Sequence, residues 1–144
     1  MNNYFSETAS GLEATTTETF HKAPINGRAA MLHRIDVTQI GGEPVSFTFN
    51  IYEDDPTLYQ GVGGDSESES EGDVTGPIPL SAIRATPGTF AGTGGRFTWF
   101  ATDHGGPLVV ALRQGNKGEC WVGITITGGG STGTFAVTLA GERE

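Results

Sequence analysis

The sequence has few of the residues that cross-link a chain. Cys120 is the only cysteine among 144 residues, so an intramolecular disulfide is impossible and the cysteine pattern of small secreted scaffolds is missing. A chain of this length suits one domain and can bury about 70% of its unfolded surface without such a bridge. We therefore expect a single hydrophobic core, with Cys120 as a small buried hydrophobic residue.

Basic residues are also scarce. Eight Lys and Arg residues stand against 17 Asp and Glu residues, which gives a formal net charge of −9. The only lysines are Lys22 and Lys117, and no Lys or Arg lies between Arg34 and Arg84. Nucleic acids and anionic membranes bind to clustered positive surfaces, so we expect neither as a partner.

Long apolar segments are missing as well. No apolar run approaches the roughly 20 residues that span a bilayer. The first 20 residues, MNNYFSETASGLEATTTETF, lack the basic and apolar regions of a secretory signal. We expect the protein to be made in the cytoplasm of its host.

The amino-terminal segment differs from the rest of the chain. Residues 1–30 are rich in Thr, Ser, Glu and Ala and show no sustained helical or strand period. We predict an extended N-terminal arm over 1–30, followed by one domain over 31–144. The arm has four isolated apolar residues as candidate partner contacts, namely Tyr4, Phe5, Leu12 and Phe20.

From residue 31 onward, apolar residues alternate with polar ones, as in half-buried strands. The segment PVSFTFNIYED is the clearest case, and GRFTWFATD, PLVVALRQ, ECWVGITIT and GTFAVTLAG repeat it. Glycine-rich turns separate these segments, and Gly41-Gly42 is typical of a hairpin turn. We predict an all-β fold, an antiparallel β-sandwich or jelly roll with the extended N-terminal arm.

The alternation also places some aromatic residues on the solvent side of the predicted strands. Exposed aromatic residues on a sheet can pack against a protein or stack on a sugar, and they can also be covered by other segments. Tyr52, Phe100 and Trp121 fall on this outward phase and are candidate surface contacts.

An acidic segment at about residues 53–76 includes DSESESEGD and carries eight acidic residues without a basic one. Like-charge repulsion favours a solvated loop here. A calcium site and phosphorylation of its serines are the alternatives. The EF-hand spacing fails because the glycine falls at the eighth position from Asp65 instead of the sixth. We predict no metal site and no cofactor.

Residues for catalysis are dispersed. His21, His33 and His104 lie far apart, and one cysteine does not complete a zinc ligand set. Asp103-His104 is the only adjacent acid–imidazole pair, and neighbouring residues seldom converge on one reacting group. We expect a turn at this pair and no enzymatic activity.

The overall layout resembles the decoration, or cement, proteins of tailed-bacteriophage heads. The resemblance lies in the Thr- and Ser-rich leader MNNYFSETASGLEATTTETF and in the tail of hairpins that ends ITITGGGSTGTFAVTLAGE. It implies a jelly roll or related sandwich, often dimeric or trimeric. Such a protein sits on the capsid exterior, binds the major capsid protein and sibling copies, and stabilises the shell against packaged DNA.

Two other functions fit the same residues. One is a carbohydrate-binding sandwich module that uses Tyr52, Trp99 or Trp121, and the other is a structural subunit of a phage tail or fibre base. On the decoration hypothesis the arm contacts the capsid, so deletion of residues 1–20 is expected to leave a folded domain without capsid affinity.

Overall fold

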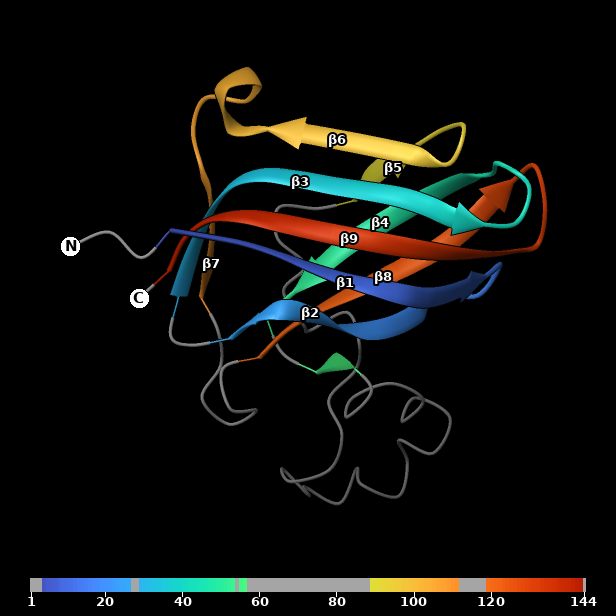
Figure 1. Ribbon diagram of the computed structural model, residues 1–144, viewed down its shortest axis with the longest axis horizontal. Coiled ribbons are helices and arrows are strands. Elements are labelled where there is room, and N and C mark those ends of the chain that lie inside the picture. The colour runs from blue at the N-terminus through green and yellow to red at the C-terminus, as the bar shows by residue number, and fades with distance from the viewer. Residues whose placement is uncertain (1–3, 27–28, 54, 57–88, 112–118, 144) are drawn as a thin grey trace, which may run out of the picture.

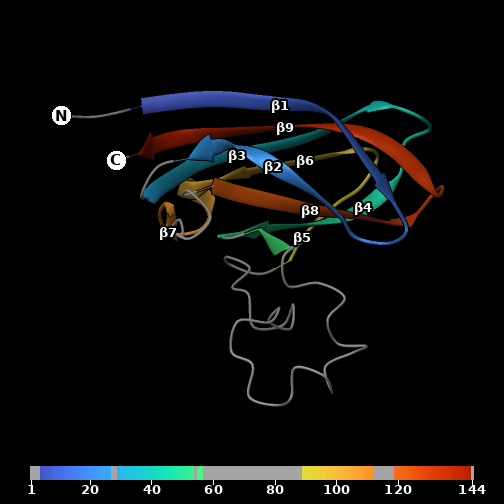
Figure 2. The same cartoon turned by 90° about the horizontal axis from the view of Figure 1, so that it is seen from below.

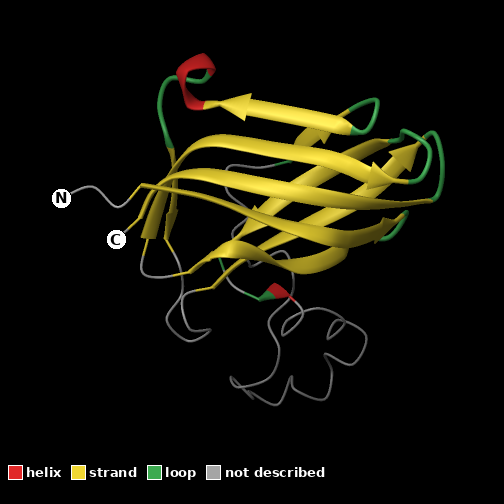
Figure 3. Ribbon diagram, in the orientation of Figure 1, coloured by secondary structure: helices red, strands yellow, loops and turns green. Residues whose placement is uncertain are grey.

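The protein is a β-sandwich. The computed structural model describes residues 4–26, 29–53, 55–56, 89–111 and 119–143, and strands dominate these ranges. Two antiparallel sheets pack face to face (Figures 1 and 3). The predicted all-β fold is therefore confirmed, and its antiparallel strands form two sheets.

Each sheet combines strands from both halves of the chain. Sheet A has the spatial order β1 (Tyr4–Thr15), β9 (Thr132–Arg143), β3 (Ala29–Gly41) and β6 (Arg96–Phe100), and β7 (Leu108–Ala111) also pairs with β3. Sheet B has the order β2 (Thr19–Asn26), β8 (Glu119–Gly128), β4 (Ser46–Tyr52) and β5 (Phe90–Gly92). Seen from below, β1, β9 and β3 lie above β8, β4 and β5 (Figure 2).

The core fills the space between the two sheets. The inward residues that the alternation predicted on β4, β8 and β9 are buried, and Cys120 has no exposed surface. The rings of Phe47 and Phe135 meet across the sheets with centroids 4.9 Å apart. The fully buried side chains include Ile35, Val37, Phe47, Phe49, Ile51, Val122, Ile124, Phe135, Val137 and Leu139.

The predicted N-terminal arm is wrong, because residues 4–26 belong to the sandwich. β1 pairs with β9 and β2 pairs with β8, both antiparallel. Phe5 and Leu12 lie in the core with 8% of their surface exposed. The pairing of β1 shifts between Ala9 and Leu12, where Gly11 has a positive φ of 74°. This irregularity interrupts the alternation, so the segment lacks a readable strand period.

The Gly41-Gly42 turn is also different from the prediction. It joins β3 of sheet A to β4 of sheet B, so it carries the chain between layers and does not close a hairpin. Gly42 has a φ of 92°, which side chains of L-residues rarely adopt. The glycine pair therefore predicted a turn correctly. The two strands that flank the turn, however, do not pair with each other.

Deletion of residues 1–15 should unfold the protein, in contrast to the expectation for an arm. It removes β1 and with it Phe5 and Leu12 from the core. Loss of one such side chain typically costs about 2–5 kcal/mol, and a domain of this size is stable by only about 5–15 kcal/mol. Thermal unfolding followed by circular dichroism should lose its cooperative transition.

The control is a deletion of residues 1–3, which precede β1 and should leave the transition in place. A cooperative transition in the protein lacking residues 1–15 would show that β1 is dispensable.

Candidate functional site

Four exposed hydrophobic side chains gather on the outer face of sheet A. We call Tyr4, Met31, Phe100 and Val109 the sheet A patch. Their exposed fractions are 69%, 39%, 44% and 57%, and among the described residues only Ile40 is a further exposed large hydrophobic. Scattered single hydrophobic residues are ordinary on protein surfaces, whereas a cluster marks a candidate interaction site.

Strand register brings the patch together. Tyr4 and Met31 both lie opposite Glu142 of β9, and Met31 lies opposite Val109 of β7. Residues directly opposite each other in antiparallel strands point to the same face, so these side chains form one row across the sheet, with Glu142 between Tyr4 and Met31.

Phe100 belongs to the adjacent row. It lies opposite Arg34 on β3, and Arg34 lies opposite Ala140 on β9. The pairing of β3 with β9 shifts between Leu32 and Arg34, which is a β-bulge at His33. β7 pairs with β3 before this bulge and β6 pairs with β3 after it, and the two strands run in clearly different directions (Figure 1). The patch therefore spans the bend of sheet A.

Charged and polar side chains lie among the hydrophobic members of the patch. His33 Nε2 lies 3.0 Å from Glu142 Oε2, and Glu142 stands within the row that the register defines. Arg34 Nε lies 2.8 Å from Asp36 Oδ2, an ion pair without the alignment of a hydrogen bond. Such half-exposed pairs contribute at most about 1 kcal/mol to stability. The patch is thus a group of exposed hydrophobic side chains interleaved with charged and polar ones.

A second group of side chains occupies the outer face of sheet B. Glu18 Oε2 accepts hydrogen bonds from Tyr52 Oη at 2.8 Å and from Asn50 Nδ2 at 3.2 Å. The rings of Phe20 and Tyr52 meet edge to face, with centroids 5.6 Å apart. A Cβ atom at Gly123 would overlap the Glu18 carboxylate, so glycine at this position allows the close approach.

This arrangement corrects the prediction that Tyr52 is a surface contact. Its side chain points outward, but only 5% of the residue is exposed. Burial raises the pKa of Tyr52 well above its usual value, and the hydrogen bond and negative charge of Glu18 raise it further. The phenol is therefore a structural hydrogen-bond donor, and it is not available for stacking on a ligand.

The remaining predicted aromatic residues have different surroundings. Trp121 is partly buried, and its indole Nε1 is buried without a hydrogen-bond partner. Trp99 is 5% exposed, and the ring of His104 stacks on it at a centroid distance of 5.4 Å. Trp99 and His104 line a hollow of about 350 Å³ with Phe90 and Phe97. A sugar would have to displace the imidazole to stack there on Trp99.

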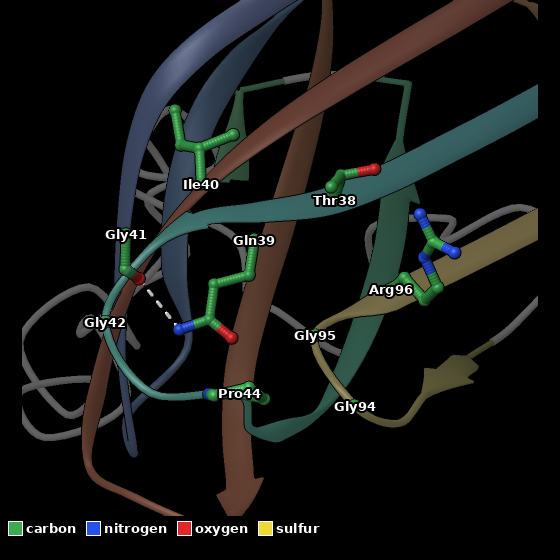
Figure 4. A pocket seen from close by; sticks show the side chains of 9 residues that line it. All are labelled: Thr38, Gln39, Ile40, Gly41, Gly42, Pro44, Gly94, Gly95 and Arg96. Carbon is green, nitrogen blue, oxygen red and sulfur yellow. Dashed lines mark hydrogen bonds between the residues drawn. The ribbon is translucent and has the colours of Figure 1, made fainter.

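Another hollow, of about 430 Å³, lies at the Gly41-Gly42 end of the sandwich (Figure 4). Its polar side chains are Thr38, Gln39 and Arg96, and the amide of Gln39 already binds the adjoining turn. Gln39 Nε2 donates to the carbonyl oxygens of Gly41 and Glu43, and Oε1 accepts from the Val45 amide. Because its amide is occupied in this way, Gln39 holds the turn and is not a free ligand group.

Asp103, His104 and the possible metal ligands were the remaining candidates for chemistry in the part of the chain that the structure describes. Asp103-His104 lies in the predicted turn, where 3₁₀ helix η4 (Ala101–Asp103) ends and the His104 amide donates to the Ala101 carbonyl at 3.0 Å. The described residues contain no group of three or more His, Cys, Asp or Glu that could hold a metal ion. None of their helices is long and apolar enough to cross a membrane.

The acidic segment lies mostly outside the described residues. Of its eight acidic residues, only Glu53 and Asp55 are described. The predictions of a solvated loop, a calcium site or phosphorylation therefore concern residues that the structure does not describe.

Comparisons with known proteins leave the family of this chain open. No protein-family model matches the sequence, and no curated protein matches it. The function must therefore be argued from the surfaces of the sandwich.

Substitution of Gly123 should test the close packing under Glu18. In Gly123→Ala the new methyl group displaces the carboxylate from Tyr52 and Asn50, at an expected cost of about 1–3 kcal/mol. Gly128→Ala is the matched control on the same strand, since the nearest atom to its Cβ would be 3.9 Å away. Urea unfolding should show a loss for the first variant and little change for the second. Equal stability of the two variants would contradict the packing described.

The raised pKa of Tyr52 should appear as alkaline destabilisation. An unfolded tyrosine ionises near pH 10, whereas the folded protein keeps this proton to higher pH. Above about pH 10 the unfolded state therefore binds fewer protons, and the free energy of unfolding falls as pH rises. Tyr52→Phe lacks this titration and should lose stability less steeply between about pH 9 and 11. Parallel urea-unfolding profiles would rule out the raised pKa.

Proposed function

We propose that the protein is a non-enzymatic virion structural protein. It decorates and stabilises the outer surface of a phage capsid by binding the major capsid protein and sibling copies. The observation that carries this proposal is the sheet A patch, four exposed hydrophobic side chains on one face of a chain that is otherwise strongly acidic.

The strand order supports the proposal. The orders β1-β9-β3-β6 and β2-β8-β4-β5 correspond to an eight-stranded jelly roll of two four-stranded sheets, with β7 as an additional strand. Viral capsid domains use this architecture, and so do lectins and cupins, so the topology alone does not assign a function. We propose the jelly roll as the finer description of the sandwich.

Attachment through the folded domain replaces attachment through an arm. Tyr4 belongs to the sheet A patch, while Phe5 and Leu12 lie in the core and Phe20 packs on Tyr52. A preformed surface binds without the entropy cost of ordering a flexible segment. Many modest contacts become strong when they are repeated around a shell, so a small patch is adequate for this role.

The structure bears differently on the two alternative functions, carbohydrate binding and a structural role in a phage tail or fibre base. A carbohydrate-binding module is disfavoured because Tyr52 is buried and His104 covers Trp99. A subunit of a phage tail or fibre base would use the same patch and the same fold. The location of the protein on the virion is what distinguishes this second alternative from capsid decoration.

Co-expression with the major capsid protein encoded in the same genome tests the function. The protein should sediment with empty capsid shells in a sucrose gradient and raise the temperature at which the shells disrupt. Shells made without it are the control. Density outside the shell at regular positions in cryo-electron microscopy is the expected result. A protein that stays at the top of the gradient, or that localises to the tail in whole virions, would contradict capsid decoration.

A further inference from the structure

We infer that the hollow between β5 and β6 is a binding site for a small, neutral aromatic molecule that carries one hydrogen-bonding group. The hollow has a volume of about 350 Å³, and its lining includes Phe90, Phe97, Trp99, His104, Pro107 and Leu108. No residue of the sheet A patch lines it. The inference is therefore independent of capsid binding, and either can fail without the other.

The hollow forms where both sheets end at the same edge of the sandwich. β5 is the last strand of sheet B and β6 is the last strand of sheet A, and the turn at Gly94-Gly95 joins them (Figure 4). Phe90 lies opposite the buried Phe49, and Phe97 lies opposite the buried Val37. Both rings therefore face the interior. They remain partly exposed because the sheets formed by the described residues end here.

The recessed position of these rings favours a small molecule over a protein as the occupant. Of the five exposed large hydrophobic side chains in the described residues, none lines the hollow. A stable protein interface buries about 800 Å² on each partner, whereas a ligand site needs a concavity of about 300–1,000 Å³. An apolar cavity of about 150 Å³ already holds benzene. The hollow therefore suits a molecule of one or two rings.

The lining determines which kind of molecule fits. The ring centroids of Phe90 and Phe97 are 5.4 Å apart, and Phe90 meets Trp99 edge to face at 6.4 Å. Such walls favour an aromatic ligand through face and edge contacts. The lining contains no acidic residue, lysine or arginine, so an ionised ligand would lose hydration without gaining an opposite charge. A sugar is disfavoured as well, because most of its hydroxyl groups would lack partners.

His104 supplies the hydrogen-bonding group of the site. Its ring is stacked on Trp99 at an interplanar angle of 14°. The amides of His104 and Gly106 both donate to the carbonyl oxygen of Ala101 at 3.0 Å, which fixes the turn. The imidazole is thus positioned before a ligand arrives, and little ordering is needed on binding. Within the described part of the chain its nitrogens have no hydrogen-bond partner, so they are free to bond to a ligand.

Titration of the full-length protein with phenol, followed by ¹H–¹⁵N NMR spectra at pH 7, tests the inference. Phenol is a neutral aromatic ring with one hydroxyl group at this pH. The amide signals of Phe90, Phe97 and Gly106 should shift saturably, with a dissociation constant of about 1 mM. Benzene should bind about two- to tenfold more weakly, because it lacks the hydroxyl group.

Three variants separate the parts of the site. Leu108→Trp fills the hollow and should remove the saturable shifts. His104→Phe keeps a ring beside Trp99 without the nitrogens and should bind phenol and benzene equally. Phe100→Ala is the matched control, because it removes a ring from the same strand as Phe97 but outside the hollow, and it should bind phenol like the wild type. Well-dispersed spectra establish that each variant is folded.

A wild-type protein without saturable shifts up to about 20 mM phenol would overturn the inference. A folded Leu108→Trp variant that binds phenol normally would also overturn it. Shifts confined to residues outside the hollow would do the same, so the location is tested even if Leu108→Trp does not fold. A His104→Phe variant that still prefers phenol to benzene would refute the hydrogen bond assigned to His104 and with it the proposed ligand class.

Discussion

The structure depends on the insertion of its last two strands into the middle of both sheets. β9 lies between β1 and β3 in sheet A, and β8 lies between β2 and β4 in sheet B. Tyr4 consequently lies opposite Glu142, at the other end of the chain. Neither sheet can be completed by one half of the sequence, so the core forms only when both ends have joined it. Such distant pairings also favour slow folding.

This constraint explains which parts of the fold the sequence predicts. Some strands, such as residues 46–52 and 132–143, have one buried face and one face toward solvent. In these strands the alternation of apolar and polar residues identifies both the strand and its inward residues. β1 is an edge strand whose inward positions are interrupted by the irregularity at Gly11. Its apolar residues therefore looked isolated. Pairing of β1 with β9 is a tertiary property, and local composition does not contain it.

The candidate site was predictable only in part, for related reasons. Phe100 is exposed as its phase predicted, whereas Tyr52 has the same phase but is covered by Glu18 and Phe20. Met31 and Val109 were missed. Val109 lies within a continuous apolar run, which periodicity cannot distinguish from a strand buried on both faces. Met31 precedes the bulge at His33, which breaks the alternation along β3. A strand on a one-sided sheet must expose every second residue, and that rule is the signal that would have identified Val109.

The uneven distribution of charge connects the fold to the proposed assembly. Eight of the 17 acidic residues lie between residues 53 and 73, and no basic residue lies among them. Charge of one sign keeps free molecules apart in solution. Repulsion thus disfavours wrong contacts, and the apolar patch supplies attraction at one place. A weak contact of this kind is suited to assembly on a repetitive surface. Each molecule can bind, dissociate and rebind until its neighbours are in place, because stability comes from the number of contacts.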